Sequence, residues 1–315
     1  MEKPRILAVV GPTAGGKSAL AEALALRLDG EIVSCDSMQI YRHMDIGTAK
    51  PTKAEQERVP YHLIDIVEPE QEFSAADYAT AAEEAVREIH SRGKLPIFCG
   101  GTGLYLDVFL RGMPEAPASD ATLRAQLMEL AERQGALFLH EELKKVDAES
   151  AKSIHPSNVR RVARALEIYR ATGVTKTEWD RRSRLIPPRY SATVLGVTYQ
   201  NRELLYARAD ARVEQMLSEG LLEETKYLLK RGVFRVSKTA ASAIGYKELL
   251  PYFAGECALE TAVEELKKAT RRYAKRQITW FSAKDYVCPL WADDGEKMLK
   301  YEEFVNNALK IVGNA

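Results

Sequence analysis

Short apolar runs alternate with longer amphipathic stretches along most of this chain. Stretches such as 19–28 and 73–90 have helical spacing, and Ser74 and Asp77 are placed as an N-terminal capping box. Runs that are apolar throughout are typical of strands buried on both faces of a sheet; they lie at 6–10, 31–35, 94–99 and 192–197, with 61–67 as a further extended candidate. The alternation predicts an α/β fold with a parallel sheet flanked by helices.

The middle of the chain follows a different pattern. Residues 120–172 are helical in pattern, with Ser119 or Asp120 as the N-terminal cap, and contain no strand-like run. We therefore expect an all-helical insertion at 113–195 within an α/β core formed by 1–112 and 196–315.

Two further helical stretches are predicted in the C-terminal part of the core. The pattern is helical over 202–230, where Arg208 and Arg212 share one helix face. Residues 260–281 form an amphipathic helix with an expected inner stripe of Val263, Leu266, Ala269 and Tyr273.

Amino-acid composition excludes only a few classes of protein. The chain has 315 residues, of which 46% are hydrophobic and 29% charged, as in ordinary globular proteins. No apolar run is long enough for a membrane span, and the apolar run at the start is too short for a secretory signal. The four cysteines have no zinc-type spacing, and Cys35 and Cys99 lie in apolar strands, so we expect buried thiols and a cytoplasmic protein.

The first candidate for chemistry is a glycine-rich loop directly after the first apolar run. It fits the P-loop pattern, in which backbone N–H groups and a lysine hold phosphate oxygens while a Ser or Thr hydroxyl binds Mg²⁺. A strand before it and a helix after it are the context that this motif requires. We therefore predict a di- or triphosphate site formed by Gly11, Pro12, Thr13, Ala14, Gly15, Gly16, Lys17 and Ser18.

Asp36 is the second candidate. It follows the apolar run 31–35, and ligands of open parallel sheets bind beyond the carboxyl ends of the strands, so Asp36 should lie at the same edge as the P-loop. The alternative is that Asp36 only caps a turn or a helix start together with Ser37.

Positive charge is concentrated locally although Lys plus Arg and Asp plus Glu both total 45. The stretch 158–189 holds nine basic and three acidic residues, a net charge of plus six. The helix at 260–281 interleaves basic side chains with aromatic ones. Both patterns suit a nucleic-acid partner, while solvated faces and a basic helix with Trp280 and Phe281 in the core are the alternatives.

Taken together, these motifs closely resemble the tRNA dimethylallyltransferase family. The resemblance covers nearly the whole chain in the family's order and is far more specific than a P-loop alone. Gly15 and Ser18 stand where the family more often has Ser and Thr, and Ser18 keeps the hydroxyl. Nothing resembles the zinc finger of eukaryotic members. The matching stretches are 11–18, 36–41, 44–51, 74–78, 100–105, 154–156, 164–167, 244–246 and 275–280.

The resemblance implies a P-loop NTPase-like fold and transfer of a dimethylallyl group from dimethylallyl diphosphate to N6 of adenosine 37 in tRNA. By family match, Asp36 is the general base, and Lys17, Arg212 and Thr13 stabilise the diphosphate together with the P-loop amides. Mg²⁺ is the expected cofactor, bound through Ser18.

The resemblance also implies the partner. The acceptor is an anticodon stem-loop with adenosine 3′ of the anticodon, whose base is flipped into the site, and the protein is expected to act as a monomer. Ser37, Met38 and Gln39 approach the target base with Asp36. Further tRNA contacts are expected at Thr102, Arg160, Arg161, Arg164, Ile244, Gly245, Tyr246, Lys275, Arg276 and Gln277.

Three alternatives remain at this point. The local motifs alone favour a P-loop kinase of a small molecule or nucleotide, with Asp36 as base, although the basic insertion has no evident role there. An adenylate isopentenyltransferase of the cytokinin type shares the N-terminal motifs but needs neither the insertion nor 275–280. A non-enzymatic RNA-binding ATPase would leave Asp36 and Arg212 without a role.

Overall fold

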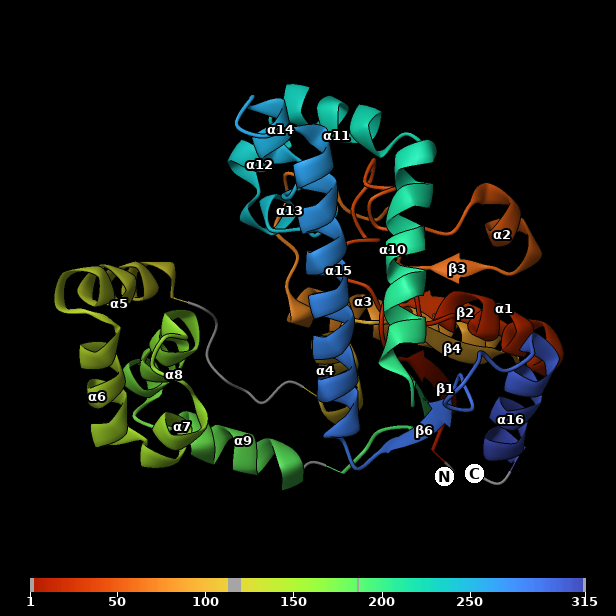
Figure 1. Cartoon of the computed structure of the whole chain (residues 1–315). Coiled ribbons are helices and arrows are strands. Elements are labelled where there is room, and N and C mark those ends of the chain that lie inside the picture. The colour runs from red at the N-terminus through yellow and green to blue at the C-terminus, as the bar shows by residue number, and fades with distance from the viewer. Residues whose placement is uncertain (1–2, 113–119, 186, 314–315) are drawn as a thin grey trace. The chain divides into compact units, whose positions relative to one another are not determined.

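The computed structural model describes residues 3–112, 120–185 and 187–313 (Figure 1). The chain divides into two compact units, one formed by Met1–Leu110 and Arg189–Ala315 and the other by Arg111–Pro188. Because the second unit lies within the sequence of the first, it is an insertion.

The first unit contains a six-stranded, all-parallel sheet with the strand order β3-β2-β4-β1-β5-β6. The P-loop strand β1 therefore lies inside the sheet, next to β4, and β2 follows on the other side of β4. The strands are β1 (Arg5–Val10), β2 (Gly30–Ser34), β3 (Tyr61–His62), β4 (Leu95–Gly100), β5 (Ser191–Thr198) and β6 (Val287–Trp291).

Both faces of the sheet are covered by helices. Alternate residues of β1 point to opposite faces: Leu7 and Val9 pack with α1 (Lys17–Leu28) and α16 (Tyr301–Gly313), whereas Ile6, Ala8 and Val10 pack with α3 (Ala75–Ser91) and α4 (Gly103–Arg111). Double coverage explains why the inner strand β1 is apolar throughout from Ile6 to Val10. The predicted capping box of α3 is present, with Ser74 and Asp77 bonded reciprocally.

A third apolar cluster joins residues 38–46 to the helices beyond the sheet. In Figure 1 the long helices α10 (Arg202–Ser218) and α15 (Leu259–Ser282) run side by side, and Arg271 on α15 bonds Asp210 on α10. The short helices of this part are α11 (Leu221–Lys230), α12 (Val233–Val236), α13 (Lys238–Ala241) and α14 (Leu250–Phe253), whereas α2 (Lys53–Arg58) lies near β3 (Figure 1).

The second unit is helical and has its own apolar core. Its most buried charge is Glu167, which accepts hydrogen bonds from Arg124 and Arg164. Asp120 caps the first helix as one of the two predicted candidates, whereas Ser119 lies outside the described residues. The helices are α5 (Ala121–Gln134), α6 (Ala136–Val146), α7 (Ala148–Ser153), α8 (Val159–Thr172) and α9 (Lys176–Leu185).

Three structural expectations need correction. The insertion was expected to extend to residue 195, but β5 begins at Ser191 and pairs with β1, so the insertion ends at Pro188; the other expected boundary, 113, lies outside the described residues. The extended segment 61–67 is a strand only at Tyr61–His62, because Leu63 and Asp65 have positive φ. The buried stripe of α15 is Ala262, Leu266, Thr270, Ala274, Gln277 and Phe281; it shares only Leu266 with the expected stripe, and the burial of Phe281 agrees with the alternative stated for this helix.

A buried carboxylate fastens the sheet to the end of α3. Glu31 is 3% exposed and accepts hydrogen bonds from Arg92, with His62 Nε2 at 2.7 Å. Burial alone would raise the pKa of Glu31, but the hydrogen bonds from Arg92 and His62 outweigh it and lower the pKa below its ordinary 4.5. The ion pair therefore stabilises the fold above pH 4.5, and this contribution is lost as the pH falls through the lowered pKa.

We predict that Arg92→Ala lowers the free energy of unfolding at pH 7, because the carboxylate of the buried Glu31 then loses the hydrogen bonds from Arg92. The difference from wild type should shrink at pH values well below 4.5, where Glu31 becomes protonated. Urea titrations at both pH values measure it. Lys94→Ala is the control, because Lys94 pairs with the exposed Asp29, and a loss as large as that of Arg92→Ala would contradict the assignment.

Candidate active site

The P-loop leads from β1 into α1 and borders a cavity of about 820 Å³. Thr13 to Ser18 line this cavity, whereas Gly11 and Pro12 are buried beneath it. Lys17 Nζ donates to the Pro12 carbonyl at 2.6 Å. The pKa of Lys17 is lowered from 10.5 to about 8, mainly because burial disfavours the ammonium form and in smaller part because the cation Arg212 is near. An anion bound in the cavity would stabilise the ammonium form of Lys17.

Asp36 lies two residues beyond the end of β2 and lines the same cavity as Lys17 and Arg212. Its Oδ1 accepts the Met38 N–H at 2.9 Å, so the alternative of a capping role is partly right: Asp36 closes a turn. The negative charge of Asp36 also stabilises the cationic forms of Lys17 and Arg212. Asp36 is thus a turn former that also brings a carboxylate to the cavity lined by Lys17 and Arg212.

The helix α10 contributes two arginines to the cavity wall. Arg208 Nε donates to the Ala14 carbonyl at 2.9 Å and so fixes the P-loop. The sequence predicted that Arg208 shares a helix face with Arg212, but it did not predict this contact. Arg212 is half-buried, and desolvation lowers its pKa below the ordinary value. Arg212 thus brings a desolvated positive charge to the cavity that holds Lys17.

Gln277 of α15 links the P-loop to the loop after β4. Its Oε1 accepts the Thr13 N–H at 2.7 Å, and its Nε2 donates to the Gly101 carbonyl at 3.0 Å. A Cβ at residue 101 would lie 1.9 Å from Gln277 Nε2, so only glycine allows this approach. Gln277 is 4% exposed and lines the cavity, and its amide is engaged in these bonds, so it stabilises the site internally; its contact with tRNA stays a prediction.

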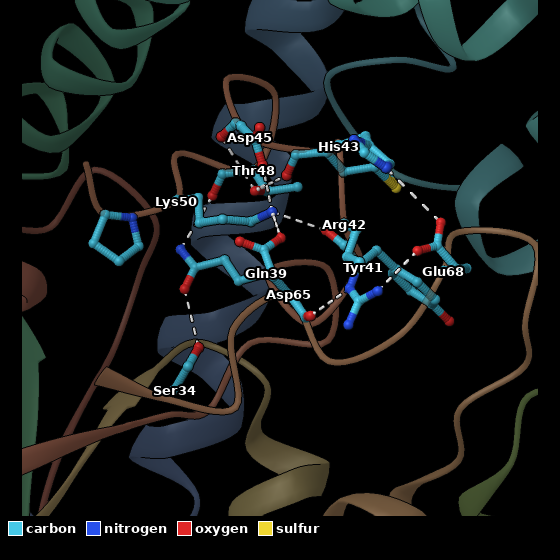
Figure 2. A network of polar contacts seen from close by, with 12 residues as sticks. Ser34, Gln39, Tyr41, Arg42, His43, Asp45, Thr48, Lys50, Asp65 and Glu68 are labelled. Carbon is cyan, nitrogen blue, oxygen red and sulfur yellow. Dashed lines mark hydrogen bonds and ion pairs between the residues drawn. The ribbon is translucent and has the colours of Figure 1, made fainter. Parts of the chain in front are cut away.

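The loop after β2 is closely hydrogen-bonded. Thr102 Oγ1 accepts the Ser37 N–H at 2.9 Å, which ties the loops after β2 and β4 together. Figure 2 shows Gln39 between Ser34 and Thr48, and Lys50 among Asp45, Asp65 and the Tyr41 carbonyl. Gln39 lines the cavity, whereas Ser37, Met38 and Thr102 do not. Lys50, Arg208 and Tyr273 line it as well and had no predicted role.

The remaining predicted tRNA residues lie in three places. Arg160 and Arg161 are exposed on α8 of the second unit, whereas Arg164 is engaged by the buried Glu167. Lys275 and Arg276 are exposed on α15.

Ile244, Gly245 and Tyr246 lie in the part of the first unit beyond the sheet. Tyr246 is 0% exposed and Gly245 is also buried. Tyr246 therefore packs in the interior of this part of the protein, and its contact with tRNA stays a prediction.

Comparison with known proteins identifies the family of this chain. Residues 39–284 match the family model described as IPP transferase. A tRNA dimethylallyltransferase of Caldanaerobacter subterraneus is 47% identical over 311 residues, which cover 98% of this chain and 97% of the relative. The chain belongs to the IPP transferase family.

Solved members of the IPP transferase family have the same fold. The full-length tRNA isopentenylpyrophosphate transferase of Bacillus halodurans matches with a TM-score of 0.73 at 40% identity, covering 99% of this chain and 96% of that one. A eukaryotic dimethylallyltransferase acting on tRNA matches with a TM-score of 0.78 at 30% identity, covering 98% of this chain and 77% of that one. The predicted family and the P-loop NTPase-like α/β class are confirmed.

Two further properties of this IPP transferase follow from the described residues. None of its described helices is both long and apolar enough to cross a bilayer. Burial raises the pKa of the Cys35 thiol to about 12 and that of the Cys99 thiol to about 11, so both remain protonated near neutral pH, as expected for buried cysteines.

Proposed function

We propose that this chain transfers a dimethylallyl group from dimethylallyl diphosphate to N6 of adenosine 37 in tRNA and releases diphosphate. The observation that carries the proposal is the meeting of Lys17, Arg212 and Asp36 at one cavity in a member of the IPP transferase family. Cations at this cavity suit a diphosphate, and a carboxylate beside them suits an acceptor that must lose a proton.

The diphosphate leaves with the electron pair of the breaking C–O bond. Lys17, Arg212 and the free N–H groups of the P-loop oppose the negative charge that develops on it. The same interactions stabilise a leaving diphosphate whether it departs from carbon or from phosphorus. A P-loop can therefore serve prenyl transfer.

The new N6–C bond forms as the C–O bond breaks, and the proton of N6 passes to the Asp36 carboxylate. An exocyclic amine is a weak nucleophile because its lone pair is delocalised into the ring, so removal of the proton matters for rate. Thr13 is a further proposed contact of the diphosphate through its side chain, since its N–H is bonded to Gln277.

Mg²⁺ is the proposed cofactor. The Ser18 hydroxyl and the Asp36 carboxylate line one cavity, and such hard oxygen donors, together with diphosphate oxygens, are ligands that Mg²⁺ prefers. Of these we assign Ser18 as the protein ligand. When bound, Mg²⁺ would neutralise part of the diphosphate charge.

The proposed acceptor is an anticodon stem-loop with adenosine 3′ of the anticodon. Stacking in the loop hides N6, so the base must be flipped to reach Asp36. Exposed cations on α8 and α15 are suited to the RNA backbone; they are Arg160, Arg161, Lys275 and Arg276. We propose a monomer that acts in the cytoplasm.

The deciding experiment incubates the purified chain with Mg²⁺, dimethylallyl diphosphate and this stem-loop, followed by mass spectrometry of the RNA. We expect one dimethylallyl adduct on the adenosine, and none on a control stem-loop with guanosine at that position. An unmodified RNA, together with ATP-dependent phosphorylation of a small acceptor, would instead support the kinase alternative.

Removing two exposed cations of the insertion should weaken RNA binding. We predict that the double variant Arg160→Gln/Arg161→Gln binds the stem-loop more weakly and lowers the slope of log affinity against log salt by about 0.7–0.9 per lost phosphate contact. Filter-binding titrations at several salt concentrations measure this slope. The matched control is Arg181→Gln/Arg182→Gln, which removes the same charge from side chains already paired with Glu178. An unchanged slope for the Arg160 and Arg161 variant, or an equal decrease in the control, would contradict the assignment.

A further inference from the structure

A single carboxylate on α11 holds the loop that forms one wall of the cavity. Glu224 Oε2 accepts the N–H groups of Asp45 and Ile46, both at 2.9 Å, and Oε1 accepts the Gly47 N–H at 3.0 Å. The Tyr246 hydroxyl donates to Oε1 at 2.7 Å. Three successive backbone N–H groups on one carboxylate form a nest-type arrangement, and bonds to an ionised acceptor are about twice as strong as neutral ones.

The backbone approaches Tyr246 too closely here for any other residue than glycine. A Cβ at residue 47 would lie 2.4 Å from Tyr246 Cζ. Gly245 has φ +110°, and a Cβ there would lie 3.0 Å from the Gly47 carbonyl oxygen. The family motifs that contain Gly47 and Tyr246 thus meet in space around Glu224, although they are separated by about two hundred residues of sequence.

The loop that Glu224 holds lines the cavity and contacts Gln39, the residue proposed to approach the target base. Asp45, Ile46 and the residues from Thr48 to Lys50 line the cavity. The carbonyls of Thr48 and Ala49 accept both bonds donated by the Gln39 amide, and the Ser34 hydroxyl donates to Gln39 Oε1 (Figure 2). The orientation of Gln39 therefore depends on where this loop lies. Glu224 itself is not among the lining residues of the cavity.

We propose that Glu224 is a positioning residue for the RNA acceptor: it fixes the loop 45–50, which in turn orients Gln39 beside Asp36. The proposal rests on the proposed function, in which Gln39 and Asp36 face the target base. No hydrogen bond links this loop to the P-loop among the described residues, so the donor side should not depend on Glu224.

The test compares Glu224→Gln with Glu223→Gln, a neighbouring and exposed glutamate on the same helix. The amide introduced at position 224 would place a donor against N–H groups, which releases the loop. We expect kcat/KM for the stem-loop to fall on the order of 10–100-fold in Glu224→Gln. The affinity for dimethylallyl diphosphate should stay within about twofold, and the control should stay within about twofold of wild type in both. Tyr246→Phe removes one of the four bonds and should give a smaller loss of the same kind.

Hydrogen exchange tests, without any enzymatic turnover, whether Glu224 fixes the loop 45–50. In Glu224→Gln the amides of residues 45–47 should exchange faster, while the P-loop peptide 11–18 keeps its wild-type rate. Equal losses for donor and acceptor, or wild-type exchange at 45–47, would overturn the proposal. If wild-type protein failed to modify the RNA, the proposed function would fail, and the exchange result would still decide whether Glu224 holds the loop.

Discussion

Replacing Asp36 with asparagine is expected to lower kcat for dimethylallyl transfer about 10²–10⁴-fold, the usual contribution of a positioned general base. The substitution separates the two roles that the structure gives this residue. Asparagine keeps an Oδ1 that can accept the Met38 N–H, so the turn after β2 persists. It cannot take a proton from N6, so the chemical step is lost while the surrounding backbone is retained.

The measurement is single-turnover transfer to the anticodon stem-loop, together with RNA affinity and thermal unfolding. RNA affinity should change by less than about threefold, because a general base contributes to the transition state and little to ground-state binding. Asp36→Ala is the matched variant: it should be equally slow and less stable, since it also loses the turn. Near wild-type activity in Asp36→Asn would mean that Asp36 only caps the turn and that the base lies elsewhere.

The position of the site could be predicted because it depends on local sequence and on a general property of parallel sheets. The P-loop is recognisable from eight successive residues, and Asp36 follows an apolar strand, so both lie at the carboxyl edge of the sheet. Arg212 was brought in by family match, and its helix α10 indeed lines the same cavity.

The contacts that hold the site together could not be predicted in this way. Gln277 reaches Thr13 across most of the chain, and its burial breaks the apolar pattern from which an inner stripe of α15 is deduced. The buried Thr270 has the same effect, because its hydroxyl is satisfied by the Leu266 carbonyl within the helix. Polar side chains that are fully hydrogen-bonded in the interior look like surface residues in sequence.

The edge strand β6 shows a second limit. It contains Pro289, which lowers strand propensity, and it is missing from the predicted elements. Proline is tolerated there because β6 pairs only with β5 and is the last strand of the sheet. Tyr246 shows a third limit: its burial and its close approach to Gly47 could not be deduced from the motif that contains it.

The second large effect is expected at Lys17. Lys17→Met should lower kcat about 10²–10³-fold, because a buried cation that opposes the charge of the leaving diphosphate is lost. Wild type should also show a specific pH dependence. The pKa of Lys17 is lowered to about 8, so the ammonium form is lost as the pH rises through 8, and kcat/KM for dimethylallyl diphosphate should fall over this range. Bound diphosphate favours the ammonium form, so kcat at saturating donor should fall only at higher pH.

Initial rates between pH 6.5 and about 9.5 at low and at saturating donor measure both quantities. Lys17→Arg distinguishes charge from geometry, because a guanidinium stays protonated throughout: its activity should be reduced but without the fall near pH 8. Lys53→Met removes an exposed lysine at the cavity rim and should keep the wild-type profile. A fall near pH 8 that persists in Lys17→Arg would assign the titration to another group. In that case the P-loop lysine would bind the diphosphate with an ordinary, fully retained charge, and its burial would have no consequence for donor binding.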